Sequence, residues 1–199
     1  MTQAREGKIA LLFMDAAHFV MGCDFLGYIY GKVRRFVKTF SGRMRYNVLG
    51  AIDFLTKRVT TVTNDTYITS TEVCVILDKV AQAYKGKEIY FVLDNAKYQK
   101  CATVTQKAES LGTHLIFIPP YSPNLNLVER LWKFVKTRLR TKYYDDFVVF
   151  RGTIDDLVES SEEVNRTIIE KLISDKVQLF DNLIPANKNT YRVKLQAVS

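Results

Sequence analysis

The chain has 199 residues, of which 47% are hydrophobic and 25% are charged. A chain of this length and composition can build one packed core, so the fibrous and intrinsically disordered classes are excluded. Its 29 Lys and Arg residues against 21 Asp and Glu residues give a net charge of +8 at pH 7, which attracts polyanions and makes nucleic acid the first partner to consider.

The first elements along the chain are expected to be strands. Residues 8–15 read KIALLFMD, an apolar run that ends abruptly at Asp15 and is typical of a strand buried on both faces. Residues 46–54 and 57–63 are rich in β-branched and aromatic residues, and the short link between them predicts a hairpin. These segments therefore predict the beginning of a β-sheet.

A helix and a further strand follow. Thr69 and Glu72 have capping-box spacing at the start of residues 69–84, whose apolar residues repeat with a helical period. Residues 88–94 read EIYFVLD and repeat the design of the first strand, again ending in an acid, Asp94. The chain thus repeats one pattern, an apolar strand that stops at an aspartate.

Helices dominate the rest of the chain. Residues 101–111 are predicted to be helical and to stop at Gly112, and residues 114–120 are a short strand ended by prolines. A helix is expected over about residues 126–140. An acidic amphipathic helix then carries one apolar face, made of Ile154, Leu157, Val158, Val164, Ile168 and Leu172. This order of strands and helices predicts an α/β sheet covered by helices.

The sequence predicts one domain over residues 1–173. Residues 174–199 sustain no period, and PANKNT is typical of a turn or linker, so this stretch is expected to be a C-terminal tail or arm. Few cysteines and no Cys-x-x-Cys pair argue against a disulfide framework and a zinc site, and favour a reducing, intracellular compartment. The apolar run before Asp15 is far too short to span a membrane.

Three acids stand where a metal site could form. If the strands that end at Asp15 and Asp94 are parallel neighbours, both carboxylates emerge at the same edge of the sheet. They would repel each other there, but hard divalent cations would let both stay ionised. Glu129, in the first turn of the predicted helix 126–140, would complete a site for two metal ions of the kind that cleaves phosphodiesters.

Each acid also has an ordinary structural explanation. An aspartate at a strand end is usually a turn former or a helix cap, and Asp94 with Asn95 would form an Asx turn. Glu129 would complete a capping box with Asn126, or would pair with Lys133 four residues on. The residue pattern alone leaves both the metal site and these structural roles open.

Four segments carry a resemblance to a known family: FMDAAHF, GRMRYNVLGAID, FVLDNAKYQ and, above all, IPPYSPNLNLVERLWKFVK. They resemble the catalytic domain of DDE transposases, in particular the mariner superfamily and its bacterial branch, insertion-sequence family 630. They follow the family's order over roughly residues 8–140, and the last combines a rigid turn, an asparagine and a glutamate in one block. The spacing agrees as well, because 34 residues, 95–128, lie between Asp94 and Glu129.

The resemblance implies an RNase H-like α/β fold, a mixed five-stranded sheet with helices on both faces. It implies that Asp15, Asp94 and Glu129 are catalytic residues and ligands for Mg²⁺ or Mn²⁺, with two ions expected. The implied enzyme is a metal-dependent DNA transposase and endonuclease, which cleaves transposon-end DNA and transfers the strand into target DNA, typically at a TA dinucleotide. His18, within DAAHF, would orient Asp15 or a water, although a structural role is more usual for a lone histidine.

Basic residues predict a surface for DNA. The segment between Phe25 and Ile52 contains no acid, and its expected DNA-binding residues are Lys32, Arg34, Arg35, Arg43 and Arg45. A second group continues one helical face from Glu129 at spacings of four, three and four residues, and consists of Lys133, Lys136 and Arg140. Such a stripe would guide a DNA backbone toward the acid, whereas a merely solvated helix face is the alternative.

Family members normally carry helix-turn-helix domains ahead of the catalytic core, and these are expected to be absent here. The expected partners are double-stranded DNA, as transposon ends and target, a second copy of the chain, and a helix-turn-helix partner from the same element. No membrane partner is expected, and the expected location is the nucleoid in the cytoplasm of a bacterial or archaeal cell. The alternatives are a truncated or regulatory DNA-binding fragment without catalysis, or another RNase H-like nuclease.

Overall fold

A computed structural model describes residues 2–21, 44–119, 125–140, 142–159, 183–187 and 189–193. The strands are β1 (Ile9–Val20), β2 (Arg45–Asp53), β3 (Val59–Asn64), β4 (Glu88–Leu93), β5 (His114–Phe117), β6 (Leu183–Asn187) and β7 (Thr190–Val193). The helices are α1 (Thr2–Arg5), α2 (Ser70–Ala83), α3 (Ala102–Ser110), α4 (Val128–Leu139) and α5 (Phe147–Glu159). The order of elements from β1 to α5 is the one that the sequence predicts.

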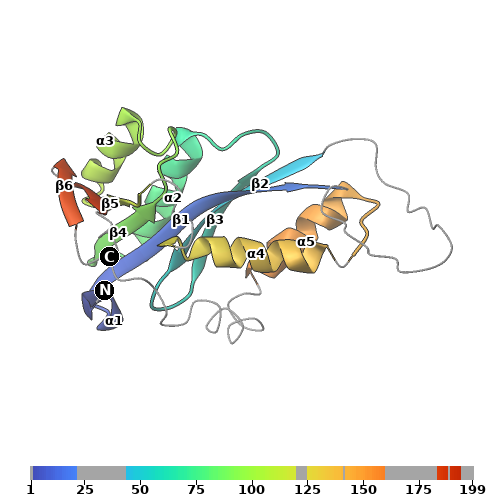
Figure 1. The fold of residues 1–199 in the computed structure, drawn as a ribbon, viewed down its shortest axis with the longest axis horizontal. Coiled ribbons are helices and arrows are strands. Elements are labelled where there is room, and N and C mark those ends of the chain that lie inside the picture. The colour runs from blue at the N-terminus through green and yellow to red at the C-terminus, as the bar shows by residue number, and fades with distance from the viewer. Residues whose placement is uncertain are drawn as a thin grey trace, which may run out of the picture.

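The strands form one mixed sheet in the order β3-β2-β1-β4-β5-β7-β6 (Figure 1). β2 pairs antiparallel with both β1 and β3, whereas β4 pairs in parallel with β1 and β5 pairs in parallel with β4. The central position of β1 and β4 explains their largely apolar sequences, because a strand covered on both faces buries most of its side chains. The predicted mixed five-stranded sheet is thus confirmed in β3-β2-β1-β4-β5.

Two further strands extend this sheet. β7 pairs in parallel with β5, and β6 pairs antiparallel with β7, so the hairpin continues the sheet beyond its predicted edge. These strands fall within residues 174–199, where the sequence predicts a tail or arm. The described part of that stretch therefore belongs to the sheet, and the boundary at residue 173 stays a prediction.

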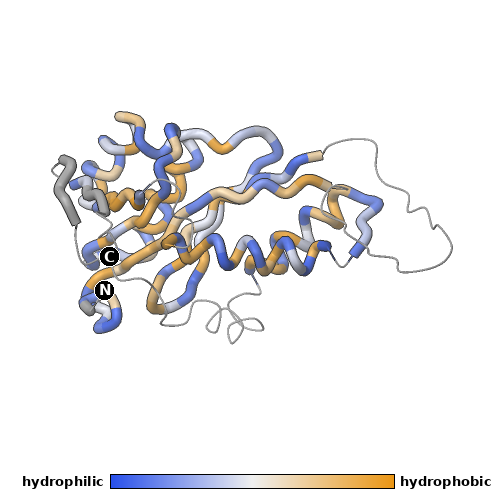
Figure 2. The backbone as a smooth tube through the Cα atoms, in the orientation of Figure 1, coloured by the Kyte–Doolittle hydropathy of each residue, from blue (hydrophilic) through white to orange (hydrophobic). Residues whose placement is uncertain are grey.

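Helices cover the sheet on both faces and divide its core in two (Figures 1 and 2). On one face α4 and α5 pack against alternate residues of β1, including Phe13 and Phe19. On the other face α2 and α3 pack against the residues between them, including Leu12 and Met14. Because successive side chains of a strand point to opposite faces, the odd-numbered residues of β1, Asp15 included, face α4.

The course of β1 corrects one expectation. The sequence predicts that this strand stops at Asp15, but β1 continues to Val20 by pairing with β2. Its parallel pairing with β4 does end there, with Met14 opposite Leu93. Asp15 thus lies in mid-strand, at the point where the neighbouring strand β4 has just ended.

The predicted helix ends are largely confirmed. The capping box of Thr69 and Glu72 begins α2, and Gly112 adopts a positive φ of +65° just after α3. The apolar face of α5 includes Ile154 and Val158, whereas Val164, Ile168 and Leu172 lie outside the described residues. Among the helices in the described residues, none has the length and apolar character needed to cross a membrane.

Candidate active site

Asp15 and Glu129 meet between the sheet and α4. Asp15 is buried, with 8% of its surface exposed, and it faces α4 from the middle of β1. Glu129 lies in the first turn of α4 and is exposed, and its carboxylate acts on the Asp15 carboxyl group through its negative charge and, more weakly, through a hydrogen bond. The fold therefore brings together an aspartate and a glutamate that are far apart in the sequence.

The surroundings of Asp15 disfavour its ionised form and raise its pKa. The pKa of Asp15 is raised from 3.8 to about 7, chiefly by burial and next by the negative charge of Glu129. Asp94 raises the same pKa through its negative charge, whereas a hydrogen bond from the Ala16 backbone lowers it. Asp15 thus retains a proton at mildly acidic pH, where an exposed aspartate is already ionised, unless a positive charge joins the three carboxylates.

Asp94 follows the last residue of β4 and reaches the same edge of the sheet. Its Oδ1 accepts a hydrogen bond from the Ala96 backbone N–H at 3.0 Å, which is the Asx turn that the sequence offered as an alternative. In the described part of the chain, no three His, Cys, Asp or Glu side chains are already gathered closely enough to hold a metal ion. The charges of Glu129 and Asp94 both act on Asp15, but the three carboxylates are not gathered closely enough to share an ion.

The start of α4 differs from the predicted capping box. The helix begins at Val128 after Leu127, and no side chain caps it at that position. Asn126 is buried, with 2% exposed; its Nδ2 donates to the Met14 carbonyl at 3.0 Å and its Oδ1 accepts from the Val128 N–H at 3.4 Å. Asn126 therefore joins the helix start to β1 at the residue just before Asp15.

Gly50 permits the close approach of α4 to the sheet. It lies directly opposite Asp15 in the antiparallel pairing of β1 and β2. A Cβ atom at this position would lie 2.7 Å from Cη2 and 2.8 Å from Cζ2 of Trp132, which is closer than real Cβ atoms come. The Trp132 ring thus occupies the space that any side chain at position 50 would need.

The sequence patterns gave no role to Gly50 or Trp132, and they indicated Asn126 only as a helix cap. A glycine inside an apolar strand was the available signal for the first, because such a glycine often marks a close approach by another group. Nothing in the local sequence pointed to the bond from Asn126 to Met14, which joins residues that are 112 positions apart.

His18 does not serve Asp15. It lies three residues along β1 and therefore on the opposite face of the sheet. Its Nδ1 lies 2.6 Å from Oδ1 of Asn47, its partner across the β1–β2 ladder. The fully buried Asn47 also donates to Asn64 and to the Thr66 carbonyl, so His18 belongs to a polar network on the α2 face.

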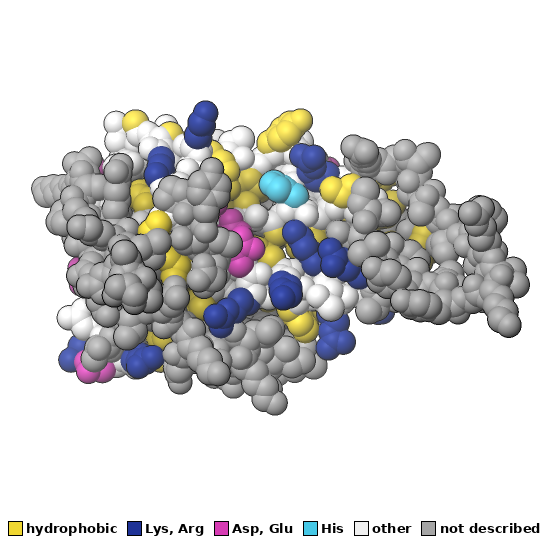
Figure 3. Space-filling view, viewed as in Figure 1, with side chains coloured by type: hydrophobic (Ala, Val, Ile, Leu, Met, Phe, Trp, Pro, Cys, Tyr) yellow, Lys and Arg dark blue, Asp and Glu magenta, His cyan; other side chains and the backbone are white. Residues whose placement is uncertain are grey.

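The basic residues of α4 lie beside the acids. Lys133 and Arg140 are exposed, and Lys136 is half-buried with its Nζ 5.9 Å from the centre of the Phe19 ring. Figure 3 shows Lys and Arg side chains over α4 next to acidic side chains. Arg45 is exposed at the start of β2, opposite Val20. The predicted residues Lys32, Arg34, Arg35 and Arg43 lie outside the described residues.

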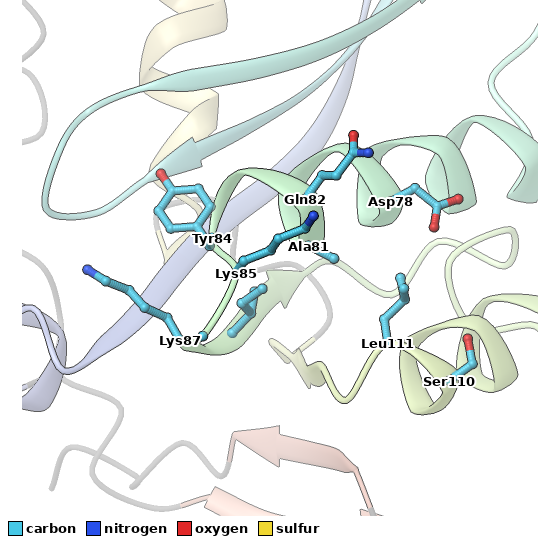
Figure 4. A pocket seen from close by; sticks show the side chains of 10 residues that line it. Asp78, Ala81, Gln82, Tyr84, Lys85, Lys87, Ser110 and Leu111 are labelled. Atoms are coloured by element: carbon cyan, nitrogen blue, oxygen red, sulfur yellow. The ribbon is translucent and has the colours of Figure 1, made fainter.

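A pocket of about 580 Å³ lies away from these acids (Figure 4). It is lined by the end of α2, the loop into β4 and the end of α3, with side chains of both charges, including Asp78, Lys85 and Lys87. Because it lies at the amino end of β4, it is at the opposite edge of the sheet from Asp94. The carboxylates and the basic face of α4 are therefore the better candidate for chemistry.

The family model of the DDE superfamily endonucleases matches residues 10–151, which is more than half of the chain and contains all three acids. The chain belongs to the DDE superfamily of endonucleases. No curated protein matches it.

Solved structures with a similar fold include transposase complexes and an integrase core. A Mos1 transposase paired-end complex with the left transposon end has 14% identity and a TM-score of 0.56, covering 87% of this chain and 56% of that one. The Mos1 strand transfer complex has 13% identity and a TM-score of 0.54, covering 91% and 57%. The catalytic core of HTLV-2 integrase, in complex with magnesium, has 13% identity and a TM-score of 0.52, covering 79% and 88%.

At such low identity these likenesses show the fold. The DDE endonuclease domain has the RNase H-like architecture of transposase and retroviral integrase catalytic cores, as the sequence predicts. It spans nearly the whole of the HTLV-2 integrase core but only about half the length of the Mos1 transposase chains.

Proposed function

We propose that the chain is the catalytic domain of a DDE transposase of the mariner superfamily, in its insertion-sequence family 630 branch. It would cleave transposon-end DNA and join the freed 3′-hydroxyl to target DNA. The observation that carries the proposal is the contact of Asp15 with Glu129 at the edge of the sheet where β4 delivers Asp94. Both steps are phosphoryl transfers that need no covalent intermediate with the protein.

Asp15, Asp94 and Glu129 are the proposed catalytic residues and ligands for Mg²⁺ or Mn²⁺. Carboxylate oxygens are the ligands that these hard cations prefer, and a cation would offset the burial and the neighbouring negative charges that raise the pKa of Asp15. Two such ions, when bound, activate a water and stabilise the leaving oxygen. To hold such ions Asp15 would have to be ionised, and Asp94 would have to offer an oxygen besides accepting from the Ala96 N–H.

The basic stripe of Lys133, Lys136 and Arg140, together with Arg45, is the proposed DNA-binding surface. Positive side chains that begin one helical turn from Glu129 would hold the phosphate backbone where the acids can reach it. The proposed partners are transposon ends and target DNA, a second copy of the chain to hold two ends together, and a helix-turn-helix protein from the same element. We propose that the protein acts at the nucleoid, in the cytoplasm of a bacterial or archaeal cell.

Nicking of a supercoiled plasmid tests this function directly. The purified protein is incubated with Mn²⁺ or Mg²⁺ beside the variant Asp94→Asn, with Asp156→Asn on the exposed face of α5 as a matched control. The proposal expects metal-dependent nicking that Asp94→Asn abolishes and Asp156→Asn retains. No nicking by the wild-type chain would instead favour a regulatory DNA-binding fragment, and nicking that survives Asp94→Asn would mean that it does not come from the proposed site.

A further inference from the structure

Glu129 is held between two contacts, each three residues away along the chain. Upstream, the buried Asn126 bonds to the Met14 carbonyl, which adjoins Asp15. Downstream, Trp132 packs into the space above Gly50, the residue that faces Asp15 across the β1–β2 ladder. Both contacts therefore join α4 to the part of the sheet that carries Asp15.

The two contacts constrain different movements of α4. The bond from Asn126 fixes where the helix starts along β1, because a hydrogen bond holds its two atoms to within a few tenths of an ångström. The absence of a side chain at Gly50 fixes how close the helix lies to the sheet, since Trp132 and Val128 both approach that position. Together they determine where the exposed Glu129 carboxylate is presented.

We propose that Asn126 and Gly50 are positioning residues that set Glu129 against Asp15 for shared metal binding. This inference rests on the proposed function, because it takes Glu129 as a metal ligand. Neither positioning residue offers an atom to an ion itself: Gly50 has no side chain, and Asn126 uses its amide on the backbone. Their effect is to hold a ligand in place, as the outer partners of metal ligands do.

Trp132 supplies a readout of this arrangement that is independent of metal. It is the single tryptophan of the chain, and it is 2% exposed, with its ring edge-on to Phe19 at 6.3 Å between centroids. Its fluorescence therefore reports how closely α4 packs against the sheet. Gly50→Ala is expected to expose the indole, which is seen as stronger quenching by iodide and a red-shifted emission.

Mn²⁺ titration measures the consequence for the site. We expect Gly50→Ala to weaken Mn²⁺ binding roughly 10–100-fold, the range seen when the outer partner of a metal ligand is removed. Removing the clash should restore binding, so Gly50→Ala should cost much less affinity in a Trp132→Phe background than in the wild type. Gly152→Ala is the matched control, because a Cβ there meets nothing within 4 Å.

Asn126→Ala is the second variant. It should weaken Mn²⁺ binding over the same rough 10–100-fold range while Trp132 stays shielded, since the packing at Gly50 is intact. Wild-type Mn²⁺ affinity in both Gly50→Ala and Asn126→Ala overturns the inference, and so does an equal loss in Gly50→Ala with and without Trp132→Phe. Glu129→Gln separates this failure from that of the proposed function: if it binds Mn²⁺ as the wild type does, Glu129 is no ligand and both proposals fall.

Discussion

The carboxyl groups of Asp15 and Glu129 lie close together, and their repulsion contributes to a raised pKa of the buried Asp15. With burial, Glu129 and Asp94 all acting in the same direction, the pKa of Asp15 rises to about 7. Ionisation of Asp15 is therefore unfavourable in the folded protein when no metal ion is bound. The stability of this endonuclease domain should consequently depend on pH and on divalent ions.

The first prediction is that stability falls as the pH rises from about 4 to about 7. In this window the native state holds a proton on Asp15 that the unfolded chain has released, so unfolding becomes easier with each step in pH. The raised pKa corresponds to a loss on the order of a few kcal/mol, at roughly 1.4 kcal/mol per pH unit. Urea unfolding of the wild type and Asp15→Asn, both in EDTA, measures the difference between them.

The free energy of unfolding of Asp15→Asn, relative to that of the wild type, should increase between pH 4 and 7 and stay constant at higher pH. Saturating Mn²⁺ should reduce it, and should stabilise the wild type more at pH 8 than at pH 5, because ions bind the ionised carboxylates. A difference that does not change with pH would mean that Asp15 ionises normally in the folded protein.

The second prediction compares the other two acids. Glu129 raises the pKa of Asp15 through its charge and a hydrogen bond, and its charge acts more strongly than that of Asp94. In EDTA at pH 8, Glu129→Gln should therefore raise the unfolding temperature, by roughly 2–4 °C for each kcal/mol gained, and more than Asp94→Asn does. In Mn²⁺ both variants should lose the stabilisation that the wild type gains, as thermal melts would record.

The exposed Asp156→Asn is the control, since it also removes one negative charge. Equal melting temperatures in EDTA for Glu129→Gln and the wild type would contradict the electrostatic repulsion that we assign to Asp15 and Glu129.

Local patterns were enough to predict most of the fold. The capping box of Thr69 and Glu72, the stop at Gly112 and the apolar periods of the strands are all encoded within a few residues. The predicted end of β1 was wrong because its last residues are held by β2, a partner that the run itself does not reveal. The hairpin of β6 and β7 was missed for the same reason, because it depends on pairing with the distant β5.

The candidate site shows the same division between local and distant information. Motif spacing picked out the three acids, and the structure brings two of them into contact. The capping box expected at Asn126 is incomplete: its Oδ1 accepts from the Val128 N–H, but the helix begins only after Leu127, and the Nδ2 of Asn126 bonds to the distant Met14 carbonyl. What sequence reasoning could not supply is the set of contacts that orient α4, since Gly50 and Trp132 belong to elements far apart in the chain.

The third prediction concerns the basic stripe. Replacing Lys133 and Lys136 by Ala should weaken binding to duplex DNA and reduce the salt dependence, by roughly 0.9 in the slope for each DNA phosphate that is no longer neutralised. Anisotropy of a labelled duplex over a salt series gives both quantities. Lys85→Ala with Lys87→Ala removes the same charge at the opposite edge of the sheet and should leave the slope nearly unchanged. If both double variants reduced DNA affinity and the salt slope equally, the α4 residues would contribute only through the net charge of the protein.

The fourth prediction is that His18 has a structural role and no part in metal binding. It bonds to Asn47 on the α2 face, whereas Asp15 and Glu129 meet on the α4 face. His18→Ala should therefore keep the Mn²⁺ affinity within about twofold of the wild type and lower stability by roughly 1 kcal/mol, the usual worth of one hydrogen bond. Mn²⁺ titration beside urea unfolding separates the two effects, with Asp15→Asn as the variant that should lose binding. A roughly tenfold loss of Mn²⁺ affinity in His18→Ala, with stability unchanged, would mean that the two faces of the sheet communicate through β1.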